Sequence, residues 1–481
     1  MQRKFITSLG FLLFLNLLIK PFWLLGIDRS VQNVTGAEVY GDYFALFNFS
    51  FLFNILLDLG ITNFNNRNIA QNRHLLSKHL SGIIMIRILL AGLYLAISLV
   101  SALVIGYDEV QIKMLLVLML NQILISFILY LRSNLAGLHL FKTDSVISVL
   151  DRTVMIGICA YLLWGRSGGS DFEIEWFIWA QTAAYVITVI ITLMLLVRKA
   201  DFLSLNWNPL FALMILKKSY PFAILILLMT FYNRVDSVML ERMLEDGPEQ
   251  AGIYAQAFRL LDASNMIAYL FAGLLLPIFS HMLKHQQDIR NMLKLSFTLI
   301  ALPAITVVLM SWFYAEEIMD LLYKGHVESS VPVFSLLMTG FFAVSTTYIF
   351  GTLLTANGNL KQLNRMAAAG MLLNIGLNLV LIPQFKATGA AVASLITQFI
   401  TAGIQVFLCM RIFKLQTDRS VMTRLGIFLV ASATVLFLSR LLTDFWMVNL
   451  AVALLSCVVI SFILKLVDLK EMTLILGKRE V

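Results

Sequence analysis

The sequence predicts an all-α polytopic membrane protein with about fourteen transmembrane helices, arranged as two parallel six-helix bundles followed by two C-terminal helices. Three observations predict this fold class. Of the 481 residues, 59% are hydrophobic and 13% are charged, whereas soluble domains have about 45–50% and about 25%. The apolar residues fall into segments that reach the roughly 20 residues a helix needs to cross a bilayer. Basic residues collect in alternate connections between these segments.

The first bundle is expected to contain six spans. Each is an apolar run bounded by polar connections, and the basic residues Arg3, Lys4, Arg67, Arg73 and Arg132 all fall at one set of ends. Acidic pairs such as Asp108-Glu109 fall at the opposite ends. The expected spans are residues 5–27, 39–60, 82–106, 112–131, 145–164 and 174–197.

The second bundle and the two added helices continue the same alternation. Their expected spans are residues 219–240, 251–280, 293–314, 331–355, 366–382, 388–410, 421–439 and 446–464. In total, about 24 Lys and Arg fall in the connections expected to be cytoplasmic and about 7, including Arg29 and Lys386, in those expected to be external. The positive-inside rule therefore predicts an inner-membrane protein with both termini in the cytoplasm.

A short repeat indicates how the bundles are related. Gly41, Tyr43 and Phe47 open the second span, and Gly252, Tyr254 and Phe258 open the eighth span with equal spacing. An offset of six spans keeps both copies in the same orientation, so the bundles are expected to be parallel. The predicted domains are residues 1–200, 201–415 and 416–481, the last comprising two further helices and a cytoplasmic tail.

Several function classes are disfavoured by composition. The net charge of +8 comes from residues that flank apolar runs, so it indicates the membrane topology of the chain and gives no reason to expect a nucleic-acid partner. Cys159, Cys409 and Cys457 are far apart in apolar segments, so neither a disulfide framework nor a thiolate metal site is expected. The connections are too short for a soluble catalytic domain, and no Walker A motif occurs. We therefore expect no enzyme, no catalytic residues, no metal and no organic cofactor.

Charged residues inside the spans are the candidate substrate ligands, because a charge at a helix centre costs about 2.5–3.5 kcal/mol on insertion scales. Arg234 has no carboxylate on its own helical face within one turn, because Asp236 points elsewhere, while Asn233 and Ser237 share its face. Lys20, expected in the external half of the first span, has no nearby carboxylate in the sequence either. A cluster of such cations suits an anionic, phosphate-bearing cargo.

Arg259 and Asp262 are three residues apart in the eighth span, so Arg259 either pairs with Asp262 or binds substrate. We expect Arg259, together with Lys20 and Arg234, to form a cationic site between the bundles. Asp236 and Asp262 are candidates for binding a coupling ion, H⁺ or Na⁺. Four residues expected near cytoplasmic helix ends are candidates for gating or ion coupling: Asp58, Arg87, Asp151 and Arg152.

Three sequence runs resemble one family. They are Gly41-x-Tyr43 through Leu57-Asp58-Leu59-Gly60-Ile61, the run from Tyr232 to Leu260, and the run from Asn378 to Ser394. They resemble flippases for polysaccharide biosynthesis of the Wzx type, which share a superfamily with MATE multidrug antiporters and lipid II flippases. The resemblance implies a MATE-like, two-lobed alternating-access fold that moves an undecaprenyl-pyrophosphate-linked oligosaccharide outward. It also implies polysaccharide polymerases and glycosyltransferases as partners.

Two other functions remain open at this level. A cation-coupled multidrug antiporter would use Asp58, Asp236 or Asp262 for H⁺ or Na⁺, but Arg234 opposes a cationic cargo. A membrane-embedded polymerase or glycosyltransferase needs acid, base or metal-binding groups at a membrane face. The histidines expected at the cytoplasmic face show no metal-binding spacing, so this alternative is the weaker one.

Overall fold

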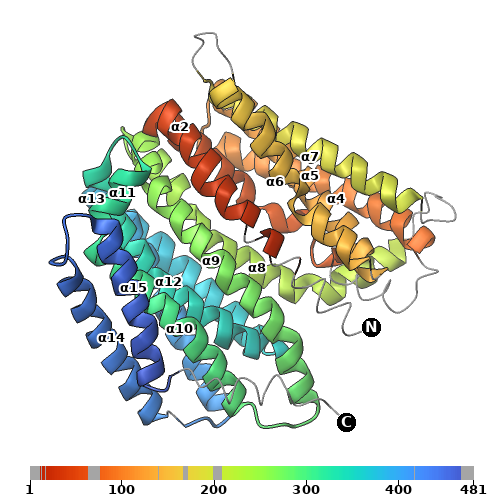
Figure 1. Cartoon of the computed structure of the whole chain (residues 1–481). Helices are drawn as coiled ribbons and strands as arrows, with labels where there is room; N and C mark the ends of the chain where they lie inside the picture. The colour runs from red at the N-terminus through yellow and green to blue at the C-terminus, as the bar shows by residue number, and fades with distance from the viewer. Residues whose placement is uncertain are drawn as a thin grey trace. The chain divides into compact units, whose positions relative to one another are not determined.

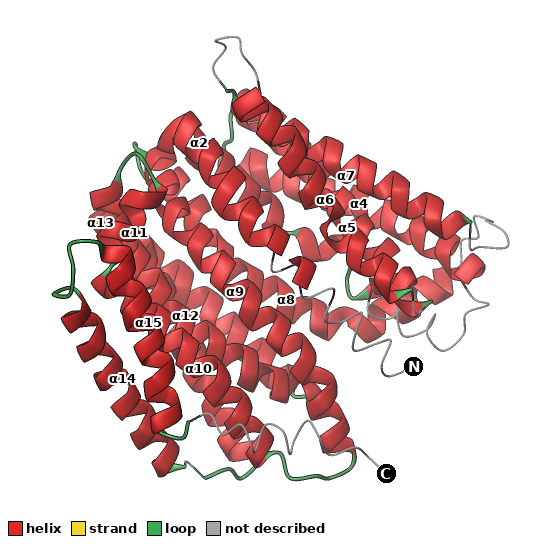
Figure 2. Cartoon of the chain, in the orientation of Figure 1, coloured by secondary structure: helices red, strands yellow, loops and turns green. Residues whose placement is uncertain are grey.

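The computed structural model describes residues 18–62, 76–138, 140–165, 172–198, 209–416 and 418–466, together with residues 11 and 14–16. Every regular element in these ranges is a helix, and no strand occurs in them (Figures 1 and 2). The predicted all-α class is confirmed. The described residues belong to two compact units. Unit 1 extends to residue 255 and includes residues 378–390, and unit 2 comprises residues 256–377 and those from 391 onward.

Unit 1 contains the helices of the first predicted bundle and the beginning of the second. Within it α7 lies beside α5 and α6, and α2 packs against both α5 and α8. Its elements are η1 (Trp23–Asp28), α2 (Arg29–Leu52), η2 (Asn54–Leu57), α4 (Leu76–Ile105), α5 (Glu109–Gly137), α6 (Phe141–Ala160), η4 (Tyr161–Gly165), α7 (Ile174–Val197), α8 (Pro209–Met243) and the start of α9 (Gly247–Lys284).

Unit 2 contains the rest of α9 and the C-terminal helices. Helices α14 and α15 lie side by side, and both pack against α10 (Figure 1). An apolar cluster that includes Leu302, Phe428 and Cys457 joins these three helices. The further elements are α10 (Arg290–Phe313), α11 (Ala315–Leu322), α12 (Val327–Ala356), α13 (Leu360–Ile412), α14 (Arg419–Ser439) and α15 (Trp446–Ile463).

The membrane spans agree with the prediction from the third span onward. Eleven helices among the described residues are long and apolar enough to cross a membrane. They correspond to the predicted spans from residue 82 to residue 464, with the eleventh and twelfth spans joined in α13. The joint is Lys386, whose φ of 51° and ψ of −132° interrupt the helix. The count of fourteen stays a prediction, as do the domain boundaries at residues 200 and 415.

The first connection is shorter than predicted. A loop was expected between residues 27 and 39, but Arg29 lies in helix, and the non-helical residue within α2 is Gly36, with φ of 81° and ψ of 169°. The break falls inside the predicted connection, and the position of Arg29 outside the membrane stays a prediction. Glycine adopts this conformation without steric cost, so the chain changes direction there without a loop. Helix α2 also ends at Leu52, earlier than the predicted residue 60. Arg3, Lys4, Arg67 and Arg73 lie outside the described residues.

The repeated glycines occupy the closest contact between α2 and α9. A Cβ on Gly41 would lie 1.8 Å from the carbonyl oxygen of Pro248, and one on Gly252 would lie 2.0 Å from that of Ala37. The side-chain amide of Gln32 donates to the Gly252 carbonyl at 2.9 Å. Backbones approach this closely in membrane helices only where the side chains are small, so the spacing of the motif now has a structural reason.

Gly41→Ala should destabilise unit 1 by at least about 1–3 kcal/mol, because the added methyl meets backbone atoms that have little freedom to move. Gly92→Ala is the matched control, since no heavy atom lies within 4 Å of its added Cβ. The control should be neutral or more stable by up to about 1 kcal/mol, as expected for Gly→Ala in a helix. Thermal unfolding of the purified proteins measures both. Equal stability of the two variants would contradict the described contact.

Candidate functional site

Lys20 and Arg152 bring two cations together inside unit 1. Lys20 is half-buried in the helical turn that precedes η1, and Arg152 is half-buried on α6. Lys20 lies close enough to Arg152, Asp151 and Arg132 to be affected by all three charges. Among the residues that the structure describes, no carboxylate lies within ion-pair distance of Lys20. We call Lys20, Asp151 and Arg152 the Lys20 cluster.

Aromatic rings surround the guanidinium of Arg152. Its Cζ lies 5.5 Å from the ring centre of Trp23 and 5.9 Å from that of Tyr185. Its Nε is 3.7 Å from the Asp151 carboxylate, which is a loose ion pair. Ring faces attract cations. The guanidinium also donates through Nη1 to Sδ of Met155 at 3.3 Å and forms a side-chain hydrogen bond with Tyr185. The arrangement holds a guanidinium in a largely aromatic setting.

The proximity of Lys20 to Arg152 was not predicted. Lys20 was expected in the external half of its span, and Asp151 and Arg152 near the cytoplasmic face, yet the structure brings them together. The reason is the shorter first connection, because the helix that contains Lys20 continues to residue 35. Lys20 therefore lies further from the end of its helix than predicted.

Arg234 lies on α8, half-buried, where this helix packs against α2. Its Nη1 donates to Oδ1 of the buried Asn48 at 3.2 Å, and its Cζ lies 5.3 Å from the ring centre of Phe51. Asn233 and Ser237, expected to add donors beside Arg234, donate instead to backbone carbonyls of α8, at 2.8 and 3.2 Å. In this conformation those bonds follow the ordinary back-bonding pattern of polar residues in membrane helices.

Asp236 is 1% exposed and joins three helices. Its Oδ2 accepts a hydrogen bond from the hydroxyl of Tyr254 on α9 at 2.9 Å. Its Oδ1 accepts one from the amide of Asn378 on α13 at 2.6 Å. Both of these bonds come from neutral donors, and a nearby cation would favour the ionised carboxylate. The ion-coupling role of Asp236 stays a prediction.

Asp58 and Arg87 form a buried ion pair at the end of η2 and on α4. Arg87 also donates through Nη1 to the hydroxyl and carbonyl of Ser126 at 2.8 and 3.0 Å, and its Cζ lies 4.8 Å from the ring centre of Tyr130. Asp58 accepts from the backbone N–H groups of Gly60 and Thr62, each at 3.1 Å. The pair ties α4 and α5 to the chain turn after η2.

Arg259 and Asp262 lie half-buried on the part of α9 that belongs to unit 2, whereas Lys20 and Arg234 belong to unit 1. A single site formed by all three cations stays a prediction. Sequence reasoning missed two polar groups of unit 1. Asp28, 3% exposed, accepts a hydrogen bond from the hydroxyl of Tyr40 at 2.7 Å. It lay in the loop predicted between the first two spans, which is why it was overlooked.

The second missed group centres on Asp42, next to the repeat glycine Gly41. Its side chain is bridged to Glu241 by the amide of Gln111. Asp42 could have been identified from the sequence, because it directly follows the repeated Gly41. Gln111 could not, because it is uncharged and lies far from Asp42 in the sequence. Only the fold brings it to the two carboxylates.

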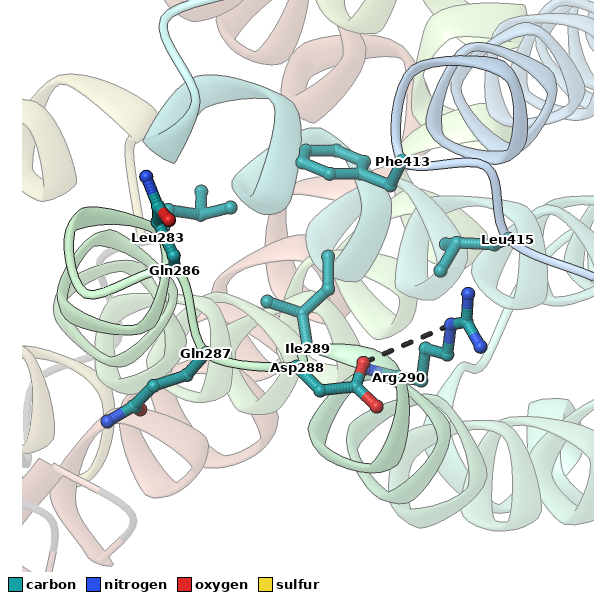
Figure 3. Close-up of a pocket in the computed structure, with 8 residues that line it drawn as sticks. All are labelled: Leu283, Gln286, Gln287, Asp288, Ile289, Arg290, Phe413 and Leu415. Carbon is teal, nitrogen blue, oxygen red and sulfur yellow. Dashed lines mark hydrogen bonds and ion pairs between the residues drawn. The ribbon is translucent and has the colours of Figure 1, made fainter.

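A surface cavity of about 470 Å³ lies in unit 2, at the connection between α9 and α10 and the end of α13 (Figure 3). Its floor is apolar, with Ile289, Phe413 and Leu415, and its rim has the ion pair of Asp288 and Arg290 at 4.0 Å. No predicted site residue lines it. Within the described ranges, no three His, Cys, Asp or Glu side chains are close enough together to hold a metal ion.

Comparison with known proteins identifies a matching family and several similar structures. A family model described as "Polysaccharide biosynthesis protein" matches residues 30–283, more than half of the chain. None of the curated proteins matches the sequence. The solved structure of the lipid II flippase MurJ in an inward closed conformation is similar, with a TM-score of 0.69, 16% identity, and coverage of 92% of this chain and 96% of that chain.

Two further solved structures share the fold. An inward-facing multidrug resistance transporter of the MATE family and MOP superfamily has a TM-score of 0.62 and 13% identity, covering 81% of this chain and 94% of that chain. A MOP superfamily transporter from Pyrococcus furiosus has a TM-score of 0.60 and 14% identity, covering 85% and 95%. At these identities the likeness establishes the MOP-type fold, as the sequence predicted.

Arg87→Ala should lower stability by about 3–5 kcal/mol, because it leaves a largely buried Asp58 carboxylate without its cation. Lys113→Ala is the control: it removes the pair with Glu109, whose two side chains are 71% and 82% exposed, and should change stability by at most about 0.5 kcal/mol. Thermal unfolding in detergent separates the two. An Arg87→Ala protein as stable as the control would show that the pair does not hold unit 1 together.

Proposed function

Because the chain belongs to the polysaccharide biosynthesis protein family, we propose that it is a flippase that moves a lipid-linked oligosaccharide across the inner membrane for surface polysaccharide assembly. The cargo is an undecaprenyl-pyrophosphate-linked saccharide, and the cycle is alternating access. Both termini are placed in the cytoplasm by the distribution of Lys and Arg. The structural relatives include a flippase and transporters, which supports this class of function.

The observation that carries the proposal is the surplus positive charge around the Lys20 cluster. Arg132 is compensated by Asp144, at 2.8 Å, and Arg152 is loosely paired with Asp151. Lys20 adds a third cation with no third carboxylate in this group. Because an uncompensated cation is costly inside a membrane, the group favours an anionic ligand such as a pyrophosphate.

Arg234 supplies a second cationic position in unit 1. Its guanidinium presents a planar fork of donors that matches phosphate oxygens better than an ammonium does. One of its N–H groups donates to Asn48 Oδ1 at 3.2 Å. In the proposal Lys20, Arg152 and Arg234 hold the headgroup, Asn233 and Ser237 adjoin it, and Arg259 contributes from unit 2.

The cycle is proposed to use a coupling ion, H⁺ or Na⁺, and Asp236 and Asp262 are its assigned sites. Asp58 and Arg87 act as a gate or structural pair. Glycosyltransferases that make the lipid-linked saccharide and a polymerase that uses it are the proposed partners.

The competing function is a cation-coupled multidrug antiporter, favoured by the MATE-type fold and by the buried carboxylates of Asp28 and Asp236. The Lys20 cluster and Arg234 weigh against it, since organic cations would be repelled at both positions.

Arg234→Ala should reduce surface polysaccharide at least about tenfold in a complementation assay, because a hydrogen bond to a charged group contributes about 1.5–3 kcal/mol. Arg234→Lys should restore part of the activity, since it keeps the charge and loses the fork. Lys20→Gln should resemble Arg234→Ala. The control is Lys217→Ala, an exposed cation. Protein level and membrane insertion are measured in parallel, and normal polysaccharide in Arg234→Ala would overturn the proposed site.

Asp236→Asn and Asp262→Asn test the coupling ion in reconstituted vesicles. Wild-type transport should increase with a pH or Na⁺ gradient, and the variants should lose that dependence because an amide neither takes up a proton in this range nor carries the negative charge that attracts Na⁺. Full activity without either gradient, unchanged in both variants, would remove these carboxylates from the mechanism.

A further inference from the structure

One polar cluster of unit 1 has no role in the function proposed above. It joins the start of α5 and the connection before it to α2 and α8, and consists of Asp42, Tyr107, Gln111, Glu241 and Arg242; we call it the Asp42 cluster. The Nε2 of Gln111 donates to Asp42 Oδ1 at 3.2 Å and to Glu241 Oε1 at 2.9 Å. One amide nitrogen therefore holds two carboxylates close together.

The two carboxylates are compensated unequally. Arg242 donates through Nε and Nη2 to both oxygens of Glu241, at 2.7 and 2.6 Å. Within the described part of the chain, Asp42 accepts one hydrogen bond, from the neutral amide of Gln111. The charged groups that face Asp42 are Glu241, Arg242 and Asp108, two anions and one cation. With Asp42 ionised, the group therefore carries two uncompensated negative charges.

Tyr107 adds an independent observation. The residue is 5% exposed, and its hydroxyl has no hydrogen-bond partner among the residues described. Its ring lies under the guanidinium of Arg242, with Cζ 4.4 Å from the ring centre. The hydroxyl is close enough to Asp42 and Glu241 to be affected by both charges. A buried hydroxyl without a partner beside surplus negative charge indicates a missing ligand.

We propose that Asp42 and Glu241 bind one proton, which is carried on Asp42. The proton comes from a hydronium ion of the solvent, which is left as water, and forms an O–H bond on the Asp42 carboxyl that donates to the Tyr107 hydroxyl oxygen. Protonation of Asp42 removes the repulsion between the two carboxylates. A metal cation does not suit the site, because Arg242 already donates to both Glu241 oxygens and, at 2.6 Å, to the side-chain amide oxygen Oε1 of Gln111.

The position of the site links the proton to a movement of α2. Asp42 directly follows Gly41, whose backbone touches the start of α9 at Pro248. Asp42 is half-buried in the structure, and separation of these segments would expose it further to water, where an ordinary aspartate ionises at neutral pH. Proton release at this site therefore accompanies opening of the contact. The inference does not depend on the identity of the cargo, and its acidic pair is distinct from Asp236.

Infrared difference spectroscopy of the purified full-length protein, titrated with acid in detergent, tests the proposal directly. A protonated carboxyl has a carbonyl stretch separate from that of a carboxylate and shifts in heavy water. The wild type should show such a band at pH values where an ordinary aspartate is already ionised. Asp42→Asn should lose it, whereas Asp236→Asn should keep it.

If Asp42→Asn does not fold, Tyr107→Phe still tests the proposal, because this variant removes only the hydroxyl group that lacks a hydrogen-bond partner among the described residues. Loss of that acceptor should move the midpoint of the band to lower pH by about half a unit to one unit. A band retained in Asp42→Asn, a band lost in Asp236→Asn instead, or an unmoved midpoint in Tyr107→Phe would overturn the proposal. A midpoint that shifts with Na⁺ concentration would assign the site to Na⁺ and would overturn it equally.

Discussion

Polar groups in membrane-spanning helices have no water to bond to, and the organisation of unit 1 depends on this constraint. Several charged side chains there are tied to other helices: Arg87 joins Asp58 and Ser126, Arg132 joins Asp144, and Asp236 binds Tyr254 and Asn378. Each bond satisfies a polar group and also fixes one helix against another. The Lys20 cluster departs from this pattern by carrying more cations than carboxylates, which is why it supports an anionic cargo.

Close backbone contact is the second organising feature. Gly41 and Gly252, the two glycines of the internal repeat, allow α2 and α9 to touch without side chains between them. Contacts of this kind hold by van der Waals packing and separate without breaking a large hydrophobic interface. The polar bonds nearby, including Gln32 to Gly252 and the Asp42 cluster, make the closed contact specific. A protein that alternates between states benefits from a junction that is tight yet small.

Much of this architecture is predictable from the sequence, because the hydropathy of a segment indicates whether it lies in the bilayer. The all-α class, the spans after residue 82 and the family indicated by the motifs around Gly41 and Tyr254 are confirmed. The connection around Arg29 is shorter than expected because a single glycine, Gly36, breaks the helix there, and window averages do not register one residue. The bonds of Asn233 and Ser237 to their own helix, and the meeting of Gln111 with Asp42, depend on rotamers and tertiary packing that no local pattern encodes.

The central claim is that unit 1 recognises an anionic lipid-linked cargo. Comparing the binding of an anionic lipid with that of an organic cation tests this claim most directly. The purified protein would be titrated with an undecaprenyl-pyrophosphate saccharide and, separately, with a lipophilic organic cation, and binding followed by native mass spectrometry. The account predicts that the pyrophosphate lipid binds and that Lys20→Gln weakens it about tenfold or more, the equivalent of about 1.4 kcal/mol. Preferential binding of the organic cation, or pyrophosphate binding that is unchanged in Lys20→Gln, would contradict it.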